Sequence, residues 1–554
     1  MPSAPSRSTS SSATATLLVR GLTVERAGAT VLADIDLTVA SGDRIGVVGP
    51  NGSGKSTLLA ALAGEIAPRS GTVSRTPPGA SVGLLRQEPM TTDDATVREM
   101  LARRTGVTAA QGELDAATRA LADGSPGADD RYALALERWL AIGAADLDAR
   151  IGETWHELGL APRLLDADPS RLSGGEAARS ALAALLLSRF DVLLLDEPTN
   201  DLDLDGLDRL LDFVLGTTAP MVLVSHDRWF LDRTVTDVVE LHEEHHTAIR
   251  YGGGWAAYLD ERATAARHAA EAFDTYQQQR QSLKARAQQQ REWSVTGERK
   301  AARNPKDNDK FVRRWSMESS ERLASKAKAT ERAMERLSPV DKPWEGWRLH
   351  LSVARVERSG DDVARLSAGV VERGSFRLGP IDVEISWAER VAIVGPNGSG
   401  KSTLLAALLG RLPLVSGSQW LGPGVVIGEL DQARRQFLDG RPLIDGVMEA
   451  TALRASEARS LLAKFGLGAD HVERRADELS PGERTRVSLA VLMSNGSNLL
   501  VLDEPTNHLD LPAIEQLESA LATWDGTMLL VTHDRRFLEA VHVDRTIDLT
   551  ADGS

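Results

Sequence analysis

The pattern of hydrophobic and polar positions divides the chain into segments with two different periodicities. Short apolar runs, such as residues 44–48, 192–195 and 390–394, have the length and composition of buried β-strands, and segments with helical spacing follow them. This alternation is typical of an α/β fold. It extends over about residues 17–259 and again over 347–554, so the pattern predicts two α/β domains.

The segment between these domains, residues 260–346, has a helical pattern instead. It is rich in Ala, Gln, Glu, Lys and Arg, which all favour helices. Apolar residues recur at spacings of four and three in each half, as in a coiled coil: Leu259, Ala263, Ala266, Ala270 and Phe273, then Leu323, Ala327, Thr330, Met334 and Leu337. Gly297 and Asn304-Pro305 interrupt this pattern. We expect a helix, a basic tip at about 295–313 and a returning helix, with a plain solvated spacer as the alternative.

One sequence, GPNGSGKSTLLAAL, occurs twice without change, at residues 49–62 and 395–408. The offset of 346 residues indicates the duplication of a whole domain. The two copies differ in length, because 85 positions separate Gln87 from Leu172 whereas 47 separate Gln432 from Leu479. The first copy therefore carries about 38 additional residues, and we expect a helical insertion around 115–165. It is either a second contact arm or only a bulkier helical subdomain.

Composition narrows the class of protein. No apolar run approaches the roughly 18–20 residues that a membrane span needs. The chain contains no cysteine, which excludes disulfides, iron–sulfur clusters and thiolate zinc sites and favours a reducing cytoplasm. Residues 1–16 are rich in Ser, Thr and Ala and contain no apolar core, so they are predicted to be a disordered tail and not a secretion signal. The expected location is cytoplasmic.

Charge is distributed unevenly along the chain. The net charge is −15, but residues 261–340 contain 18 Lys and Arg against 11 Asp and Glu. A basic segment on an acidic protein indicates a contact with a polyanion that is confined to that segment.

The duplicated sequence contains the pattern G-x-x-x-x-G-K-[ST] between a predicted strand and a predicted helix, which is the context of a phosphate-binding loop. Its glycines allow backbone amides to surround an anion, Lys55 and Lys401 would reach the β- and γ-phosphates, and Ser56 and Ser402 would ligate Mg²⁺. A chance glycine-rich turn is the alternative for one copy alone. The predicted loop residues are Gly49, Asn51, Gly52, Gly54, Lys55, Ser56 and Thr57, and Gly395, Asn397, Gly398, Gly400, Lys401, Ser402 and Thr403.

Each loop is followed by the same elements in the same order: a glutamine, the motif L-S-x-G-E, an apolar strand ending in Asp-Glu, and a histidine. The first copy has Gln87, Ser173-Gly174-Gly175, Asp196-Glu197 and His226, and the second has Gln432, Ser480-Pro481-Gly482, Asp503-Glu504 and His533. The strand would deliver its aspartate to the Mg²⁺ shell, and the next glutamate can activate an attacking water.

This order of motifs resembles that of ATP-binding cassette (ABC) domains. The resemblance implies ATP and Mg²⁺ as cofactors, Glu197 and Glu504 as catalytic bases, and His226 and His533 at the γ-phosphate. It also implies that each L-S-x-G-E motif closes over the ATP of the other cassette. Ser480 and Gly482 would then face Lys55, and Ser173, Gly174 and Gly175 would face Lys401, in a monomer that closes as an intramolecular sandwich. The implied metal-shell residues are Ser56, Gln87, Asp196, Ser402, Gln432 and Asp503.

Three departures from the ABC pattern bear on the equivalence of the two sites. Pro481 replaces the first glycine of the second signature and removes one backbone N–H. The first copy reads Asn200-Asp-Leu-Asp where the second reads Asn507-His-Leu-Asp. An aromatic residue that could stack on adenine is not evident in the first copy, and only Phe376 is a candidate in the second. Arg26 and Arg373 stand near the expected position, and a guanidinium could take that role.

Among ABC proteins the chain resembles the ABC-F family of translation factors, with two fused cassettes, Asp-Glu-Pro-Thr-Asn twice and a linker of roughly 80 residues. The resemblance implies a ribosomal partner, with the linker near the P-site tRNA and the peptidyl-transferase centre, entered from the E site. Antibiotic resistance by ribosomal protection is the favoured role, and a housekeeping translation factor or the ATPase subunit of a drug exporter are the alternatives. The predicted RNA-binding residues are Arg291, Arg299, Lys300, Arg303, Lys306, Lys310, Arg313 and Arg314.

Overall fold

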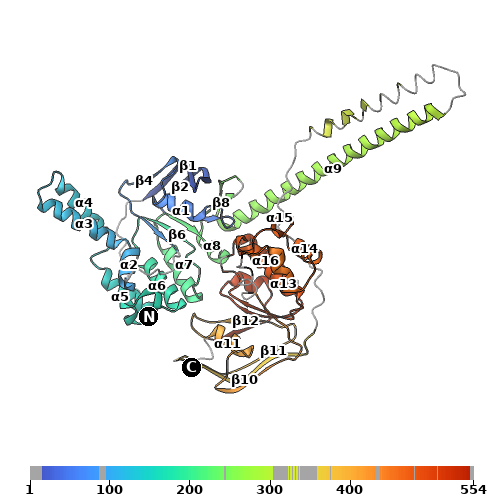
Figure 1. Ribbon diagram of the computed structural model, residues 1–554. Coiled ribbons are helices and arrows are strands. Elements are labelled where there is room, and N and C mark those ends of the chain that lie inside the picture. The colour runs from blue at the N-terminus through green and yellow to red at the C-terminus, as the bar shows by residue number, and fades with distance from the viewer. Residues whose placement is uncertain are drawn as a thin grey trace. The chain divides into compact units, whose positions relative to one another are not determined.

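The computed structural model confirms the mixed α/β fold, with two cassettes and a helical segment between them (Figure 1). The residues that it describes are 15–86, 95–242, 245–303, 358–374, 376–430, 437, 440–479, 481–507 and 509–549, with scattered positions between 318 and 336. The limits proposed above for the individual domains stay predictions.

Cassette 1 contains two sheets. The larger has the order β5-β6-β7-β3-β8-β9, and all its neighbouring strands are parallel except the pair β8–β9. The strands are β5 (Val82–Leu85), β6 (Val192–Asp196), β7 (Met221–Val224), β3 (Arg44–Val48), β8 (Asp237–His242) and β9 (Thr247–Gly252). The smaller sheet is antiparallel, in the order β2-β1-β4, and comprises β1 (Thr16–Arg26), β2 (Ala29–Val39) and β4 (Ser70–Thr76). The central strands are apolar on both faces because the sheet is covered on both sides.

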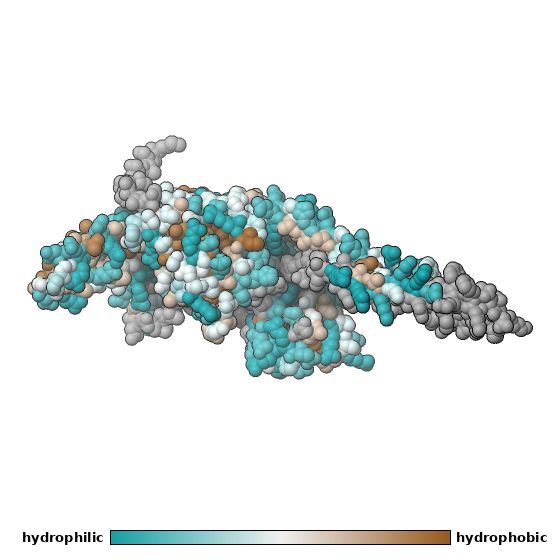
Figure 2. All heavy atoms as spheres, turned by 90° about the horizontal axis from the view of Figure 1, so that it is seen from above, coloured by the Kyte–Doolittle hydropathy of each residue, from teal (hydrophilic) through white to brown (hydrophobic). Residues whose placement is uncertain are grey.

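Ten helical segments of cassette 1 lie in the described part of the chain. They are α1 (Lys55–Ala63), α2 (Val97–Arg104), α3 (Val107–Ala122), α4 (Ala128–Ala141), α5 (Leu147–Glu157), η1 (Pro162–Asp166), η2 (Pro169–Arg171), α6 (Gly174–Leu186), α7 (Leu204–Gly216) and α8 (Arg228–Thr234). The predicted insertion falls on α3, α4, α5 and η1. Helices α3 and α4 form a hairpin that projects from cassette 1 (Figure 1). Leu121, Leu134 and Leu140 on this hairpin are exposed, and Figure 2 shows apolar residues scattered among hydrophilic ones at its end.

Cassette 2 repeats this topology. Its larger sheet has the order β14-β15-β16-β12-β17, which matches β5-β6-β7-β3-β8, and its smaller sheet has the order β11-β10-β13. The strands are β14 (Ile427–Glu429), β15 (Leu499–Asp503), β16 (Thr527–Val531), β12 (Arg390–Val394), β17 (Arg545–Asp548), β11 (Phe376–Ser386), β10 (Asp362–Arg373) and β13 (Ser416–Leu421). The helices are α11 (Lys401–Leu408), α13 (Leu443–Thr451), α14 (Ala455–Lys464), α15 (Ala469–Val472), η3 (Ala476–Glu478), α16 (Pro481–Ser494), α17 (Leu511–Ala522) and α18 (Arg535–Ala540).

Each cassette has its core between its two sheets and the helix that follows the phosphate loop. In cassette 1, Leu17 and Leu37 of the small sheet pack with Ile45 of β3 and Leu58 of α1. In cassette 2 the corresponding cluster includes Val363, Val391 and Leu404. These contacts fix the loop between strand and helix from both sides, which keeps the anion-binding amides in place.

The linker begins with α9 (Gly254–Arg303), a helix of 50 residues. From residue 257 onward, α9 belongs to a different unit from the one that contains both cassettes. The expectation that Gly297 interrupts the helix is wrong, since α9 continues through it. A single glycine costs only about 1 kcal/mol relative to alanine, and the helix formers around it offset that cost. The remainder of the predicted tip and most of the returning helix lie outside the described residues. No helix in the described part of the chain is long and apolar enough to cross a membrane.

Candidate active site

Both phosphate loops have the same backbone geometry. Gly52 and Gly54 have φ values of 93° and 97°, and Gly398 and Gly400 have values of 87° and 100°. A Cβ atom at Gly49 would lie 2.7 Å from the Leu241 carbonyl oxygen, so no larger residue fits there. The helices then begin directly at the lysines, which places their N-termini at the loop.

The loop side chains fit a phosphate group. Lys55 Nζ donates to the carbonyl oxygens of Gly49 (2.9 Å) and Pro50 (3.0 Å), and Lys401 Nζ donates to those of Gly395 (2.8 Å) and Pro396 (3.2 Å). The buried Ser53 and Ser399 hydroxyls have no hydrogen-bond partner among the residues that the structure describes. A buried hydroxyl without a partner is costly. A phosphate oxygen would satisfy it, and the ammonium groups can turn from the loop carbonyls to the same anion.

The apolar strands end where the sequence predicted. Strand β6 brings Asp196 to the carboxyl end of the sheet, and β15 brings Asp503 there. Ser402 Oγ donates to Asp503 Oδ2 at 3.0 Å, so two of the residues assigned to the metal shell are in contact. In cassette 1, Ser56 and Asp196 line a cavity of about 360 Å³ together with Glu197 and Arg26. A hydroxyl and a carboxylate at this place form a donor set that suits Mg²⁺.

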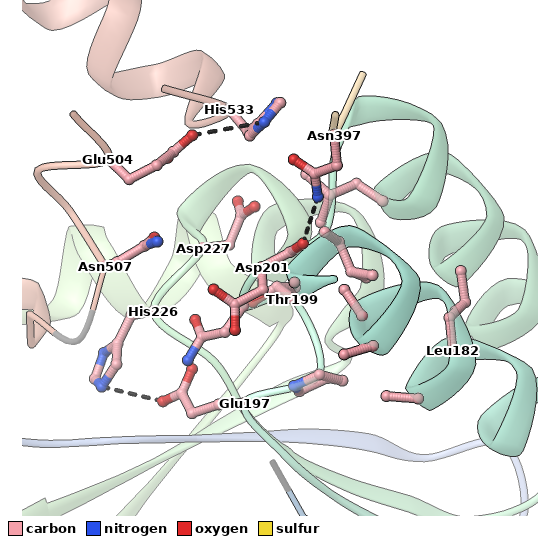
Figure 3. Close-up of a pocket in the computed structure, with 18 of the residues that line it drawn as sticks. Leu182, Glu197, Thr199, Asp201, His226, Asp227, Asn397, Glu504, Asn507 and His533 are labelled. Atoms are coloured by element: carbon pink, nitrogen blue, oxygen red, sulfur yellow. Dashed lines mark hydrogen bonds and ion pairs between the residues drawn. The ribbon is translucent and has the colours of Figure 1, made fainter. Parts of the chain in front are cut away.

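The two glutamates have strained backbones. Glu197 and Glu504 have φ values of 50° and 45°, in the left-handed region that non-glycine residues rarely adopt. Backbone hydrogen bonds hold them there, from Glu197 N to Val224 O (2.9 Å) and from Glu504 N to Val531 O (2.8 Å). Their side chains meet the predicted histidines, with His226 Nε2 3.2 Å from Glu197 Oε1 and His533 Nε2 3.5 Å from Glu504 Oε1 (Figure 3).

Burial sets the protonation of these pairs. It raises the pKa of Glu197 to about 7 against the opposing charge of Lys55, and it raises the pKa of Glu504 to about 8 against that of Lys401. Burial, and after it the lysine charge, lowers the pKa of His226 to about 3 and that of His533 to about 4. The histidines are therefore neutral at pH 7, so neither contact is an ion pair between full charges. A glutamate with a pKa near neutrality is suited to accept a proton from water.

The first signature motif lies against the opposite cassette. Ser173 caps α6 in a capping box with Glu176. A Cβ atom at Gly175 would lie 3.0 Å from Asn397 Cβ, and Gly174 and Gly175 line a cavity of about 860 Å³ together with Asn397 and Gly398. At Gly482 the nearest atoms belong to Ala513 and Asp510, in the same cassette.

Sequence reasoning missed two residues that join the cassettes. Asp203 Oδ2 accepts from Asn397 N at 2.9 Å, and Asp510 Oδ2 accepts from Asn51 N at 2.9 Å. Each aspartate also caps the helix that follows it. In addition, Asn397 Nδ2 donates to the Asp201 carbonyl oxygen at 2.7 Å (Figure 3). The repeated Leu-Asp before a helical pattern is a cap signal that could have pointed to them, but it does not reveal partners 194 and 459 residues away.

Several assigned residues are not tested by the geometry. Gln87, Gln432, Ser480, Lys306, Lys310, Arg313 and Arg314 lie outside the described residues. Arg291, Arg299, Lys300 and Arg303 lie on α9, for which only the backbone is described at these positions.

The family model for the ABC transporter matches residues 32–200 and 378–507, which is more than half of the chain. "ABC transporter F family member 5" of Arabidopsis thaliana is 31% identical over 94% of this chain and 73% of its own length. The tylosin resistance ATP-binding protein TlrC of Streptomyces fradiae is 35% identical over 94% of this chain and 95% of its own. The ribosome protection protein VmlR of Bacillus subtilis is 29% identical over 92% and 82%.

The family match covers both cassettes, and the similarity to the F-type relatives continues through the linker and over nearly the whole chain. The chain therefore belongs to the F family of ABC proteins and is an ATPase of the ABC type.

Proposed function

We propose that this ATPase binds the ribosome and protects it from an antibiotic. The similarity to TlrC, a protein named for tylosin resistance, carries the proposal because it extends over 95% of that protein's length. A second relative is named a ribosome protection protein. The basic charge of residues 261–340 supports a contact with RNA phosphates in the same segment.

We propose the same steps of hydrolysis at each site. The phosphate loop, with Lys55 or Lys401, binds the triphosphate by its amides and ammonium group. Mg²⁺, held by Ser56 and Asp196 or by Ser402 and Asp503, would neutralise phosphate charge. Glu197 or Glu504 accepts the proton of the attacking water, and the neutral His226 or His533 lies beside that carboxylate.

The cassettes and the linker would then act together. Closing both cassettes over two ATP molecules shapes a surface that enters the ribosomal E site, and the linker hairpin extends toward the P-site tRNA and the peptidyl-transferase centre. Hydrolysis removes the γ-phosphate contacts that favour the closed state, so the protein leaves the ribosome. The bonds from Asp203 and Asp510 to the opposite phosphate loops support coupling between nucleotide and closure.

Sedimentation tests ribosome binding. The variant Glu197→Gln with Glu504→Gln keeps the shape of both carboxyl groups but removes the base, so we expect it to stay closed. It should pellet with purified 70S ribosomes through a sucrose cushion only when ATP is present. The matched control, with Lys55→Ala and Lys401→Ala added, should stay in the supernatant. A folded, ATP-bound protein that never pellets would overturn the proposal and favour an ATPase that serves a membrane partner.

Translation in vitro tests protection. Wild-type protein should restore reporter synthesis in the presence of a drug that binds the peptidyl-transferase centre or exit tunnel, across a panel that includes a macrolide. We expect the protein to restore synthesis in the presence of one drug class and to leave synthesis without a drug unchanged. If the protein pellets with ribosomes but relieves none of the drugs, a housekeeping role in translation replaces the protective one.

A further inference from the structure

An ion pair joins the two cassettes next to the first site. Arg228, the first residue of α8 in cassette 1, donates from Nη1 to Glu518 Oε2 of α17 in cassette 2 at 3.1 Å, and from Nη2 to Glu518 Oε1. Both side chains are only 13% exposed. A bidentate, buried pair of this kind differs from surface pairs, because loss of one partner leaves a charge without compensation in a poorly solvated place.

Two more buried carboxylates lie around the pair, and they increase the cost of losing the guanidinium group of Arg228. Asp227 and Asp534 lie close enough that the charge of Asp534 raises the pKa of Asp227, after the larger effect of burial. Arg228 counters this negative charge, and it also lowers the pKa of Asp534 against burial. The guanidinium therefore compensates three carboxylates at the contact between the cassettes.

Helix α17 holds the first site at two points. At its N-terminus Asp510 accepts a hydrogen bond from Asn51 in the phosphate loop of cassette 1. Eight residues further along, about 12 Å at the helical rise, Glu518 holds Arg228. Arg228 is two residues from His226, which contacts Glu197. One rigid helix of cassette 2 thus positions both the phosphate loop and the histidine segment of site 1, the site built on Lys55.

The second site, built on Lys401, has only the first of these contacts in buried form. Helix α7 contributes Asp203 to Asn397, as α17 contributes Asp510 to Asn51. The position that corresponds to Glu518, eight residues after the aspartate, is Leu211. Arg535, which corresponds to Arg228, instead lies 3.4 Å from Asp208, with the two side chains 36% and 54% exposed. It also lies over the Trp229 ring at 4.3 Å. Exposed pairs of this length contribute little.

We propose that Arg228 and Glu518 are positioning residues that make site 1 the tighter site, so that nucleotide leaves site 2 first when the cassettes open. The inference rests on the two ATP sites and not on the ribosome. The two phosphate loops are identical, so they do not specify an order of release. The order follows from the residue that the opposite cassette contributes, which is Glu518 for site 1 and Leu211 at the corresponding position for site 2.

Photolabelling measures the order. The variant Glu197→Gln with Glu504→Gln is loaded with 8-azido-[α-³²P]ATP without ribosomes, chased with unlabelled ATP, and illuminated at intervals. Proteolysis then assigns the retained label to cassette 1 or cassette 2. We expect label to leave cassette 2 about tenfold faster than cassette 1, a ratio that corresponds to about 1.4 kcal/mol.

Charge exchange tests the residues. In the same background, Arg228→Glu or Glu518→Arg alone should bring release from cassette 1 close to that from cassette 2. The combined exchange should restore the slow release, which a general loss of packing would not allow. Arg535→Glu, the matched control at the exposed pair, should leave the slow release from cassette 1 unchanged. Leu211→Glu offers Arg535 the missing partner and should slow release from cassette 2.

Three results would overturn the inference: equal release from both cassettes in the parent, slow release that persists in Arg228→Glu, or an exchange variant that melts like the parent and still releases fast. If the exchange variant does not fold, Glu518→Leu, which copies Leu211, decides the question by the same assay. Absence of labelling in both cassettes would instead contradict the assignment of the ATP sites, and failure of ribosome pelleting would leave the inference standing.

Discussion

At the scale of single residues, the carboxylates of Asp227 and Asp534, next to the histidines, cap two helices although burial makes their negative charge unfavourable. Asp227 Oδ1 accepts from Phe230 N and Asp534 Oδ1 accepts from Phe537 N, each at 2.9 Å, so both cap short helices. Burial and the neighbouring Asp534 raise the pKa of Asp227 to about 6. A neutral cap of the same shape would keep the hydrogen bond and avoid the cost.

Asp227→Asn is expected to stabilise the protein at neutral pH. Because the pKa of Asp227 is higher in the folded than in the unfolded state, its favourable contribution is complete below the unfolded value and is lost as pH rises through about 6. The variant escapes that loss, so it should gain of the order of 2 kcal/mol above pH 6. Apparent melting temperatures at pH 7.5, 6 and 4.5 would show a gain that shrinks toward pH 4. Asp123→Asn on the exposed end of α3 is the control, and a gain independent of pH would contradict the explanation.

Removing the catalytic carboxylates should abolish turnover without loss of binding. Glu197→Gln with Glu504→Gln is expected to lower ATP turnover by at least about 100-fold, the low end for loss of a general base. Steady-state phosphate release measures the rate, and binding of a fluorescent ATP analogue checks that the sites are intact. Glu157→Gln, at an exposed position of α5, is the matched control. Turnover near the native rate would show that other groups activate the water.

At the scale of elements, the α3–α4 hairpin is attached to cassette 1 at a narrow base. Gly106 ends the turn before α3, and a Cβ atom there would lie 2.8 Å from Ile142 Cδ1, just after α4. The two ends of the hairpin are therefore adjacent. Within the hairpin, Ala110, Ala117, Ala128 and Ala135 are buried, so the helices pack mainly on each other.

Deleting the hairpin should leave the enzyme intact. Replacing residues 107–141 by a short Gly-Ser link joins ends that are already close, which adds little loop entropy. Basal ATP turnover is expected to stay within about twofold of the parent, because the phosphate loops and the glutamates lie on other elements. Ribosome pelleting of the same variant then separates the two roles left open for the insertion. Weakened pelleting indicates a contact arm, and a collapse of ATP turnover would show that the hairpin is part of the cassette core.

Elements and motifs were predictable where local sequence determines them. The strand, glycine loop and helix of each site follow from apolar runs and left-handed glycines, and Asp196 and Glu197 follow from the end of a strand. The continuity of α9 through Gly297 was not, because helix formers on both sides outweigh one glycine. Contacts such as that of Arg228 with Glu518 could not be predicted from the sequence either. Residues 290 positions apart meet only through the packing of two cassettes, which has no local signal.

At the scale of the whole molecule, two identical phosphate loops lie in different surroundings. Each takes part of its site from the other cassette, through Asp510 for the first and Asp203 for the second. Duplication preserved the loop, whereas the opposing residues diverged at Glu518 and Leu211. One chain thus contains two versions of one reaction centre.

Neutralising the basic residues of the predicted tip should weaken ribosome binding and leave ATP hydrolysis unchanged. Four substitutions to glutamine at Lys306, Lys310, Arg313 and Arg314 remove phosphate contacts, so pelleting should fall and its dependence on salt should weaken. Basal ATP turnover should not change, since these residues are distant in sequence from both sites. The matched control neutralises four exposed arginines of the cassettes: Arg365, Arg377, Arg411 and Arg459. Parallel loss of pelleting and turnover would indicate a folding defect.

The long helix α9 starts at a pair of glycines with positive φ, Gly253 at 90° and Gly254 at 79°. Its 50 residues correspond to about 75 Å at the helical rise. An unbroken helix of that length works as a lever arm, so a tilt of about 5° at the glycines displaces its far end by about 6 Å. Small changes in the backbone angles at these two glycines therefore suffice to move the far end of the helix by more than the length of a hydrogen bond.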